Sequence, residues 1–254
     1  MSGRAPAATT WQELLARHAP AVHQLIAQQL VNFANVAARD SSKLPSAFAG
    51  LDSVLARGIL ACGSAEVHAL IVLMHPALSD ALGAVSPSQL QHSQSAKWIL
   101  SFALLAECAG IPRPPGFDSG PLKPLIRGRR ELSDVEQRSA ALLALALRDT
   151  MTARALIDAE PASDTQPVVS FEFNLYELIR YLADAIDQRR PADWIEPAWV
   201  EYIAGFPLHL AADAAEWPDL FYFARVLADV RGGKVSDIAD DLHARVQLLA
   251  KHGQ

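Results

Sequence analysis

Helix-forming residues dominate almost the whole chain and leave little room for any other class of structure. Alanine and leucine, both strong helix formers, recur throughout the sequence, whereas clusters of β-branched residues are scarce. Only the segment VVSFEF at 168–173 has the composition of a strand, and one short strand cannot build a sheet. The sequence therefore predicts an all-α protein, a bundle of about 8–10 helices with no significant sheet.

Local signals indicate where these helices begin and end. A small polar residue followed three positions later by glutamate forms a capping box, which marks a helix start at Thr10/Glu13, Ser133/Glu136, Asn174/Glu177 and Asp193/Glu196. Glycines that follow helical runs mark helix ends at Gly63, Gly110 and Gly232-Gly233. Together these signals predict helices at 10–38, 46–62, 64–83, 87–109, 133–159, 174–188, 194–213, 218–231 and 235–252.

Residues 111–130 differ in composition from both flanking regions. They hold five of the 16 prolines and three glycines, and they lack a continuing apolar period. This composition is typical of a loop, here between an N-terminal helical subdomain at 1–110 and a C-terminal one at 131–254. The sequence leaves open whether the two halves fold separately or pack as one bundle.

Overall composition excludes several classes of protein. With 254 residues, 51% of them apolar, the chain can bury a substantial core, which excludes disordered and collagen-like proteins. Two cysteines cannot form a disulfide framework and favour a reducing compartment. A formal charge of −6 argues against nucleic-acid binding, which requires a basic surface.

Apolar residues form no segment long enough for a membrane span. The longest apolar stretch, Trp98–Ile111, has 14 residues and contains Glu107, whereas a spanning helix requires about 20 apolar residues. The N-terminus has no apolar run of the kind found in a secretory signal. We therefore expect a cytoplasmic protein without membrane contact.

Motifs for catalysis and cofactor binding do not occur in the sequence. There is no G-x-S-x-G, no G-x-x-x-x-G-K-[ST], no strand followed by G-x-G-x-x-G and no Glu-x-x-His. The pairs His209/Asp213 and Asp240/His243 each share one helical face, but solvated helix faces explain them better than a metal site. The sequence predicts no catalytic residues, no metal and no cofactor.

Isolated chemical groups on apolar helix faces are interpreted as structural. Glu107 is the best candidate for a carboxylate with a raised pKa, and Glu172 is a weaker one, but neither has an evident partner in the sequence. Cys62 and Cys108 both lie near predicted helix C-termini in apolar surroundings. That end of a helix disfavours the thiolate, so we expect buried, unreactive cysteines.

Three arginines form a small basic cluster just before the predicted helix at Ser133. Arginines beside a helix N-terminus can hold a phosphate, so Arg127, Arg129 and Arg130 are candidates for anion binding. Arginines in a linker are also often solvated, or paired with acidic residues. Both interpretations stay open at this point.

Acidic and aromatic residues concentrate together in the C-terminal half. Twelve of the 18 aromatic residues lie between Phe171 and Phe223, and ten acidic residues lie between Asp193 and Asp241. Aromatic anchors with a charged rim are typical of protein interfaces, whereas the competing interpretation places the aromatics in the core. The predicted partner-binding residues are Asp193, Trp194, Glu196, Trp199, Glu201, Tyr202, Asp213, Glu216, Trp217, Asp219 and Tyr222.

Two functions of different classes follow from these observations. The leading hypothesis is a non-enzymatic, cytoplasmic protein-binding protein, specifically an immunity protein that neutralises a basic bacterial toxin or effector through its acidic half. The alternative is an all-helical enzyme or small-molecule-binding protein with a pocket between the halves, near the Arg127–Arg130 loop. Its candidate groups are Glu107, His209, Asp213 and His243. A self-associating scaffold is a third possibility, and the sequence does not determine the oligomeric state.

Overall fold

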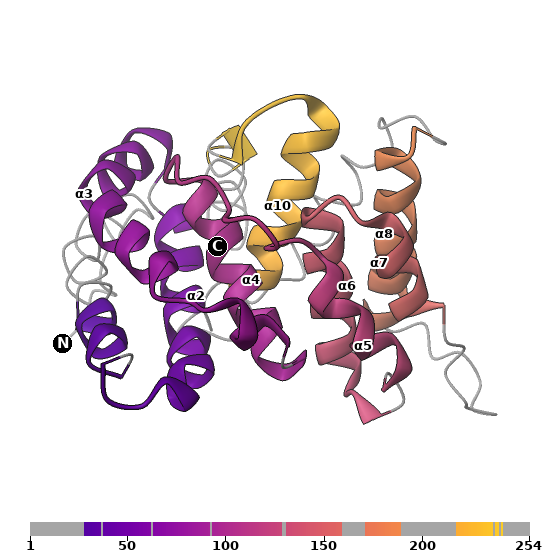
Figure 1. Ribbon diagram of the computed structural model, residues 1–254. Coiled ribbons are helices and arrows are strands. Elements are labelled where there is room, and N and C mark those ends of the chain that lie inside the picture. Colours follow the sequence, from indigo (N-terminus) through magenta and orange to yellow (C-terminus); the bar gives the residue numbers. More distant parts are fainter. Residues whose placement is uncertain are drawn as a thin grey trace, which may run out of the picture.

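The computed structural model describes residues 28–36, 38–61, 63–91, 93–128, 131–158, 171–188, 217–235, 237–238 and 240. All regular structure within these ranges is helical, and no strand occurs in them, which confirms the predicted all-α class. Figure 1 shows the helices packed side by side along the molecule.

The described elements are α-helices of different lengths and three short 3-10 helices. In chain order they are η1 (Ser41–Lys43), α2 (Leu44–Ala61), α3 (Gly63–Gly83), η2 (Pro87–Gln91), α4 (Ser93–Glu107), η3 (Gly120–Leu122), α5 (Lys123–Arg127), α6 (Asp134–Ala146), α7 (Thr150–Ile157), α8 (Phe171–Ile186) and α10 (Trp217–Arg231). Helical residues also precede η1, at 28–36 and 38–39.

Two of the four predicted capping boxes fall on described residues, with opposite outcomes. The capping box at Ser133 is confirmed: its hydroxyl accepts from the Glu136 backbone N–H, and the Glu136 carboxylate accepts from the Ser133 backbone N–H at 2.9 Å. The capping box at Asn174 is wrong, because α8 begins at Phe171 and contains Asn174. The predicted strand at 168–173 is wrong over 171–173, since the helical period of α8 extends back through these residues.

The predicted helix at 133–159 is interrupted by a tight turn. At the end of α6, Arg148 adopts a φ of 62°, and the next backbone N–H, of Asp149, donates to Ala144 O at 2.9 Å. This geometry is a Schellman motif. Its left-handed position is usually occupied by glycine, because the left-handed conformation disfavours a Cβ atom. Glycine does occupy that position after α4 and α10, at Gly110 and Gly232, with φ values of 75° and 70°.

One continuous core joins the N-terminal and C-terminal helices. Phe48 on α2 is fully buried. The centroid of its ring lies 4.5 Å from the ring centroid of Phe33 and 5.2 Å from that of Phe102. Helix α10 contacts α2 on one side and α6 and α8 on the other, in the middle of the molecule (Figure 1). The predicted domain boundaries stay a prediction, but the described core crosses them.

The described helices differ from membrane-spanning helices in length or composition. None of the helices there has both the length and the apolar composition that crossing a bilayer requires.

Candidate functional site

A pocket of about 510 Å³ lies where α2, α3 and α4 meet α10 and the turn that follows it. It therefore joins helices from the two halves predicted from the sequence. Its volume is in the usual range of small-molecule sites. The lining residues are Ile59, Val67, His68, Ile71, Glu107, Cys108, Arg225, Ala228, Asp229, Gly233, Lys234 and Val235.

The carboxylate of Glu107 is held at the end of α4, beside a turn of the chain. Because Gly110 reverses the chain after α4, Arg113 returns alongside the helix. The Arg113 Nε–H donates to Glu107 Oε1, and its Nη1 donates to Phe117 O at 3.4 Å. Glu107 thus enters the pocket already paired with a guanidinium.

The second lining carboxylate, Asp229 on α10, is gripped by Arg148 from the turn between α6 and α7. Arg148 Nε donates to Asp229 Oδ2 at 3.2 Å, and Arg148 Nη2 lies 3.1 Å from Oδ1. This is a bidentate fork, the geometry in which arginine binds a carboxylate most strongly. The pairing raises the pKa of the Arg148 guanidinium above its ordinary value.

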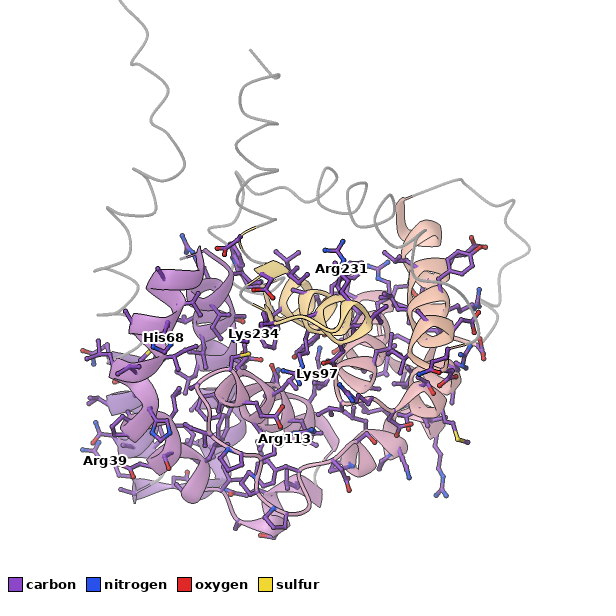
Figure 2. All side chains as sticks on the ribbon, turned by 90° about the horizontal axis from the view of Figure 1, so that it is seen from above. Arg39, His68, Lys97, Arg113, Arg231 and Lys234 are labelled. Atoms are coloured by element: carbon purple, nitrogen blue, oxygen red, sulfur yellow. The ribbon has the colours of Figure 1, made fainter. Side chains whose placement is uncertain are left out.

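The positive groups of the pocket are less well satisfied than its carboxylates. Arg225 Nε is buried, makes no hydrogen bond within the described structure, and lies 3.6 Å from Asp229 Oδ2. Lys234 and His68 are both exposed, and neither is in an ion pair with any described residue. Figure 2 labels His68 on α3 and Lys234 just beyond the end of α10.

The charge of the pocket follows from this pairing. Asp229 and Glu107 pair with Arg148 and Arg113 from outside the pocket, and Arg225 also lies within ion-pair distance of Asp229, at 3.6 Å, so that Lys234 is the lining cation without a carboxylate partner among the described residues. Asp237 lies near the rim, but its Oδ2 accepts from the Lys234 backbone N–H at 2.8 Å rather than from the side chain. The pocket therefore combines apolar side chains such as Ile59 and Ile71 with charged ones, and its basic groups exceed its carboxylates only when Arg113 and Arg148 outside it are counted.

Cys108 lies in the pocket wall but is not suited to nucleophilic chemistry. Burial raises the pKa of its thiol to about 12, so the thiol stays protonated at neutral pH. The burial predicted for this cysteine is only partial, and its low reactivity stays a prediction. Cys62 lies outside the residues that the structure describes.

A second polar cluster lies in the core, between α2, α4 and α10. Asp52 is 3% exposed, and the hydroxyl-bearing side chains of Ser101 and Tyr222 are fully buried. Burial raises the pKa of Asp52 to about 7, against the opposing effects of the neighbouring Ser101 hydroxyl and the Ser53 backbone N–H. Neither the Ser101 nor the Tyr222 hydroxyl reaches hydrogen-bond geometry with a described group.

Most of the predicted partner-binding surface lies outside the described residues. That applies to Asp193, Trp194, Glu196, Trp199, Glu201, Tyr202, Asp213 and Glu216. Of the members in α10, Trp217 and Tyr222 are buried in the core, at 4% and 0% exposure, and Asp219 is partly buried. The surface as a whole stays a prediction, and these two aromatic rings belong to the core of the fold.

The other predicted groups are only partly brought together. Arg127 is exposed at the end of α5 and does not line the pocket, and Arg129 and Arg130 fall in a gap of the described chain. Glu107 does line the pocket, whereas the remaining candidates of the small-molecule hypothesis, His209, Asp213 and His243, are not described.

Sequence reasoning missed Arg225, Asp229, Lys234 and His68 as members of one site. Arg225 and Asp229 are four residues apart, so their shared face on the predicted helix 218–231 was visible. Which helices that face would meet was not visible, because it depends on packing between segments far apart in the chain.

Metal-ligand geometry and similarity to known proteins add no information about what the pocket binds. No group of three or more metal-ligating side chains forms among the residues with described positions. Comparisons with protein-family models, with curated proteins and with solved structures each give no match. The function must be inferred from the chemistry of the pocket itself.

Proposed function

We propose that this protein binds a small anionic molecule with an apolar body in the pocket between α3, α4 and α10. The observation that carries the proposal is the pairing pattern. Both lining carboxylates already have arginine partners from outside the pocket, so that Arg225 shares Asp229 with Arg148 and Lys234 forms no ion pair with a described residue. This develops the hypothesis of a small-molecule-binding protein with a pocket between the two halves.

Each part of such a ligand has a matching surface. Its carboxylate, sulfonate or phosphate would accept charge-assisted hydrogen bonds from Arg225 and Lys234, which are roughly twice as strong as neutral ones. The His68 imidazole offers an additional N–H donor. The apolar body would lie against Ile59 and Ile71, where leaving water is favourable.

Isothermal titration with octanoate and with octan-1-ol tests this proposal. The two probes share one apolar chain and differ in charge, so the ratio of their affinities isolates the contribution of the anion. We expect octanoate to bind at a single site and about tenfold more tightly than octan-1-ol, which corresponds to about 1.4 kcal/mol.

Lys234→Ala removes one positive group from the rim and should reduce that preference. Lys43→Ala is the matched control, because Lys43 is an exposed lysine paired with Asp40 and lies outside the pocket. Equal affinities for the two probes, or an octanoate preference that both variants retain in full, would overturn the proposal.

The protein-binding, immunity-type function remains a hypothesis from sequence. Native mass spectrometry of the protein purified gently from its host separates the two functions. A small-molecule adduct supports the pocket, whereas a basic polypeptide at fixed stoichiometry supports the acidic surface.

A further inference from the structure

We infer that Arg148 is a positioning residue for the pocket: it occupies Asp229 and thereby keeps Arg225 available to a bound anion. The inference rests on the proposed function for its consequence in binding. Its structural part concerns only three side chains and can be tested without a ligand.

The geometry shows a competition for one carboxylate. Asp229 is within reach of two arginines, Arg148 from the turn after α6 and Arg225 from one turn earlier on α10. Arg148 contacts both carboxylate oxygens, at 3.2 and 3.1 Å, whereas Arg225 Nε stays 3.6 Å from Oδ2 and forms no hydrogen bond. Arg148 therefore holds the carboxylate, and Arg225 is left without a direct donor–acceptor contact.

Only one of the two arginines lines the pocket. Arg225 is in the pocket wall, whereas Arg148 is not among the lining residues and its side chain is 66% exposed. Arg148, although exposed and outside the pocket, thus determines how much of the Arg225 charge is available to an anion in the pocket. No inspection of the pocket wall alone would identify Arg148.

The backbone at Arg148 provides an unusually clean way to remove its side chain. With a φ of 62°, Arg148 has a conformation that glycine adopts without strain and that the described chain gives to glycine after α4 and α10. Arg148→Gly should therefore leave the turn between α6 and α7 intact. The variant removes the guanidinium and relaxes the backbone at the same time.

Removal of Arg148 should allow Asp229 to accept a hydrogen bond from Arg225, whose Nε now lies 3.6 Å from the carboxylate in an ion pair without a hydrogen bond. The two residues are four apart on one helix, the spacing at which oppositely charged side chains meet. Once Arg225 donates to Asp229, less of its charge is available to an anion. We expect Arg148→Gly to weaken octanoate binding about tenfold without lowering the unfolding midpoint.

The double variant Arg148→Gly/Asp229→Asn separates this effect from a simple loss of positive charge near the pocket. Asparagine cannot form an ion pair with Arg225, so octanoate affinity should return to within a small factor of the wild-type value. Arg180→Ala is the control: Arg180 is also an exposed arginine paired with an aspartate, Asp158 at 3.3 Å, and it lies on α8 away from the pocket. This control should bind octanoate like the wild type.

The nuclear magnetic resonance signal of the Arg225 Nε–H group, recorded without ligand, tests the structural part directly. In Arg148→Gly this proton should shift and exchange more slowly with water, because it has gained an acceptor. If the wild type does not bind octanoate, the proposed function fails and this signal alone decides the positioning role. An Arg225 signal unchanged in Arg148→Gly, or octanoate affinity equal in that variant and the wild type, would overturn the inference.

Discussion

Asp52 provides the sharpest test of the packing between α2, α4 and α10, through the variant Asp52→Asn. The residue is 3% exposed, and burial raises the pKa of its carboxyl from the ordinary value of 3.8 to about 7. Asparagine keeps the shape and can still accept from the Ser53 backbone N–H, which lies 2.7 Å from Asp52 Oδ1. The variant therefore removes the titration and little else.

The sign of the effect follows from where protons are bound. Between about pH 4 and pH 7 the folded protein keeps the Asp52 proton while the unfolded chain releases it, so the free energy of unfolding falls as pH rises. The difference between a pKa of 3.8 and one of about 7 corresponds to about 4 kcal/mol, at about 1.4 kcal/mol per pH unit. Outside this window the contribution of Asp52 is constant.

Ionisable groups near Asp52 also influence how the free energy of unfolding depends on pH. Lys97 on α4 lowers the pKa of Asp52, and burial together with the nearby Asp52 charge raises the pKa of Tyr222 well above its ordinary value. Exposed carboxylates elsewhere titrate in the same range. The informative quantity is therefore the difference in unfolding free energy between the wild type and Asp52→Asn at each pH.

Urea unfolding followed by circular dichroism measures this difference. We expect the wild type to lose about 4 kcal/mol relative to Asp52→Asn between about pH 4 and pH 7, with no further change above pH 8. Parallel stability curves across that window would refute the burial of Asp52 and, with it, the packing of the three helices around it.

Three further outcomes test the fold and the pocket wall. Phe48→Ala should lower the free energy of unfolding by about 3–5 kcal/mol, because it empties a fully buried site and removes two ring contacts; urea denaturation measures this. Ser133→Ala should lower the free energy of unfolding by about 1 kcal/mol, because it removes the capping box of α6. Glu136→Ala breaks the same capping box, so the double variant should lose less than the sum of the two single losses. In a Cys62→Ser background, iodoacetamide should label Cys108 far more slowly at neutral pH than it labels a free thiol, because burial raises the pKa of this partly buried thiol to about 12; labelling at the rate of a free thiol would contradict the described pocket wall.

The helices were largely predictable because their signals are local. The apolar period and the glycines at Gly110 and Gly232 marked helix ends that the structure confirms. The break at Arg148 was not predictable, because an arginine in a left-handed conformation carries no sequence signal of its own. The strand prediction for VVSFEF is wrong over 171–173, because the helical period of α8 outweighs the strand-like composition of these residues.

The pocket was predictable only in outline. A site between the two halves, near the Arg127–Arg130 loop, was one of the hypotheses; Glu107 was one of its candidates and lines the described pocket, whereas Arg127 does not. The partners of Glu107 and Asp229 come from different parts of the chain, Arg113 from the loop after α4 and Arg148 from the turn after α6. Such pairings depend on tertiary packing, and a single sequence contains no periodic pattern that reports them.

The position of α10 has a consequence for how the protein is made. This helix packs against α2, yet it begins at Trp217, so its partners are synthesised long before it. Until it leaves the ribosome, the faces against which Leu220, Phe221 and Phe223 pack lack the cover of α10. Contacts this distant in sequence form slowly, because a long loop must close first. We expect the nascent chain to depend on chaperones until α10 has emerged.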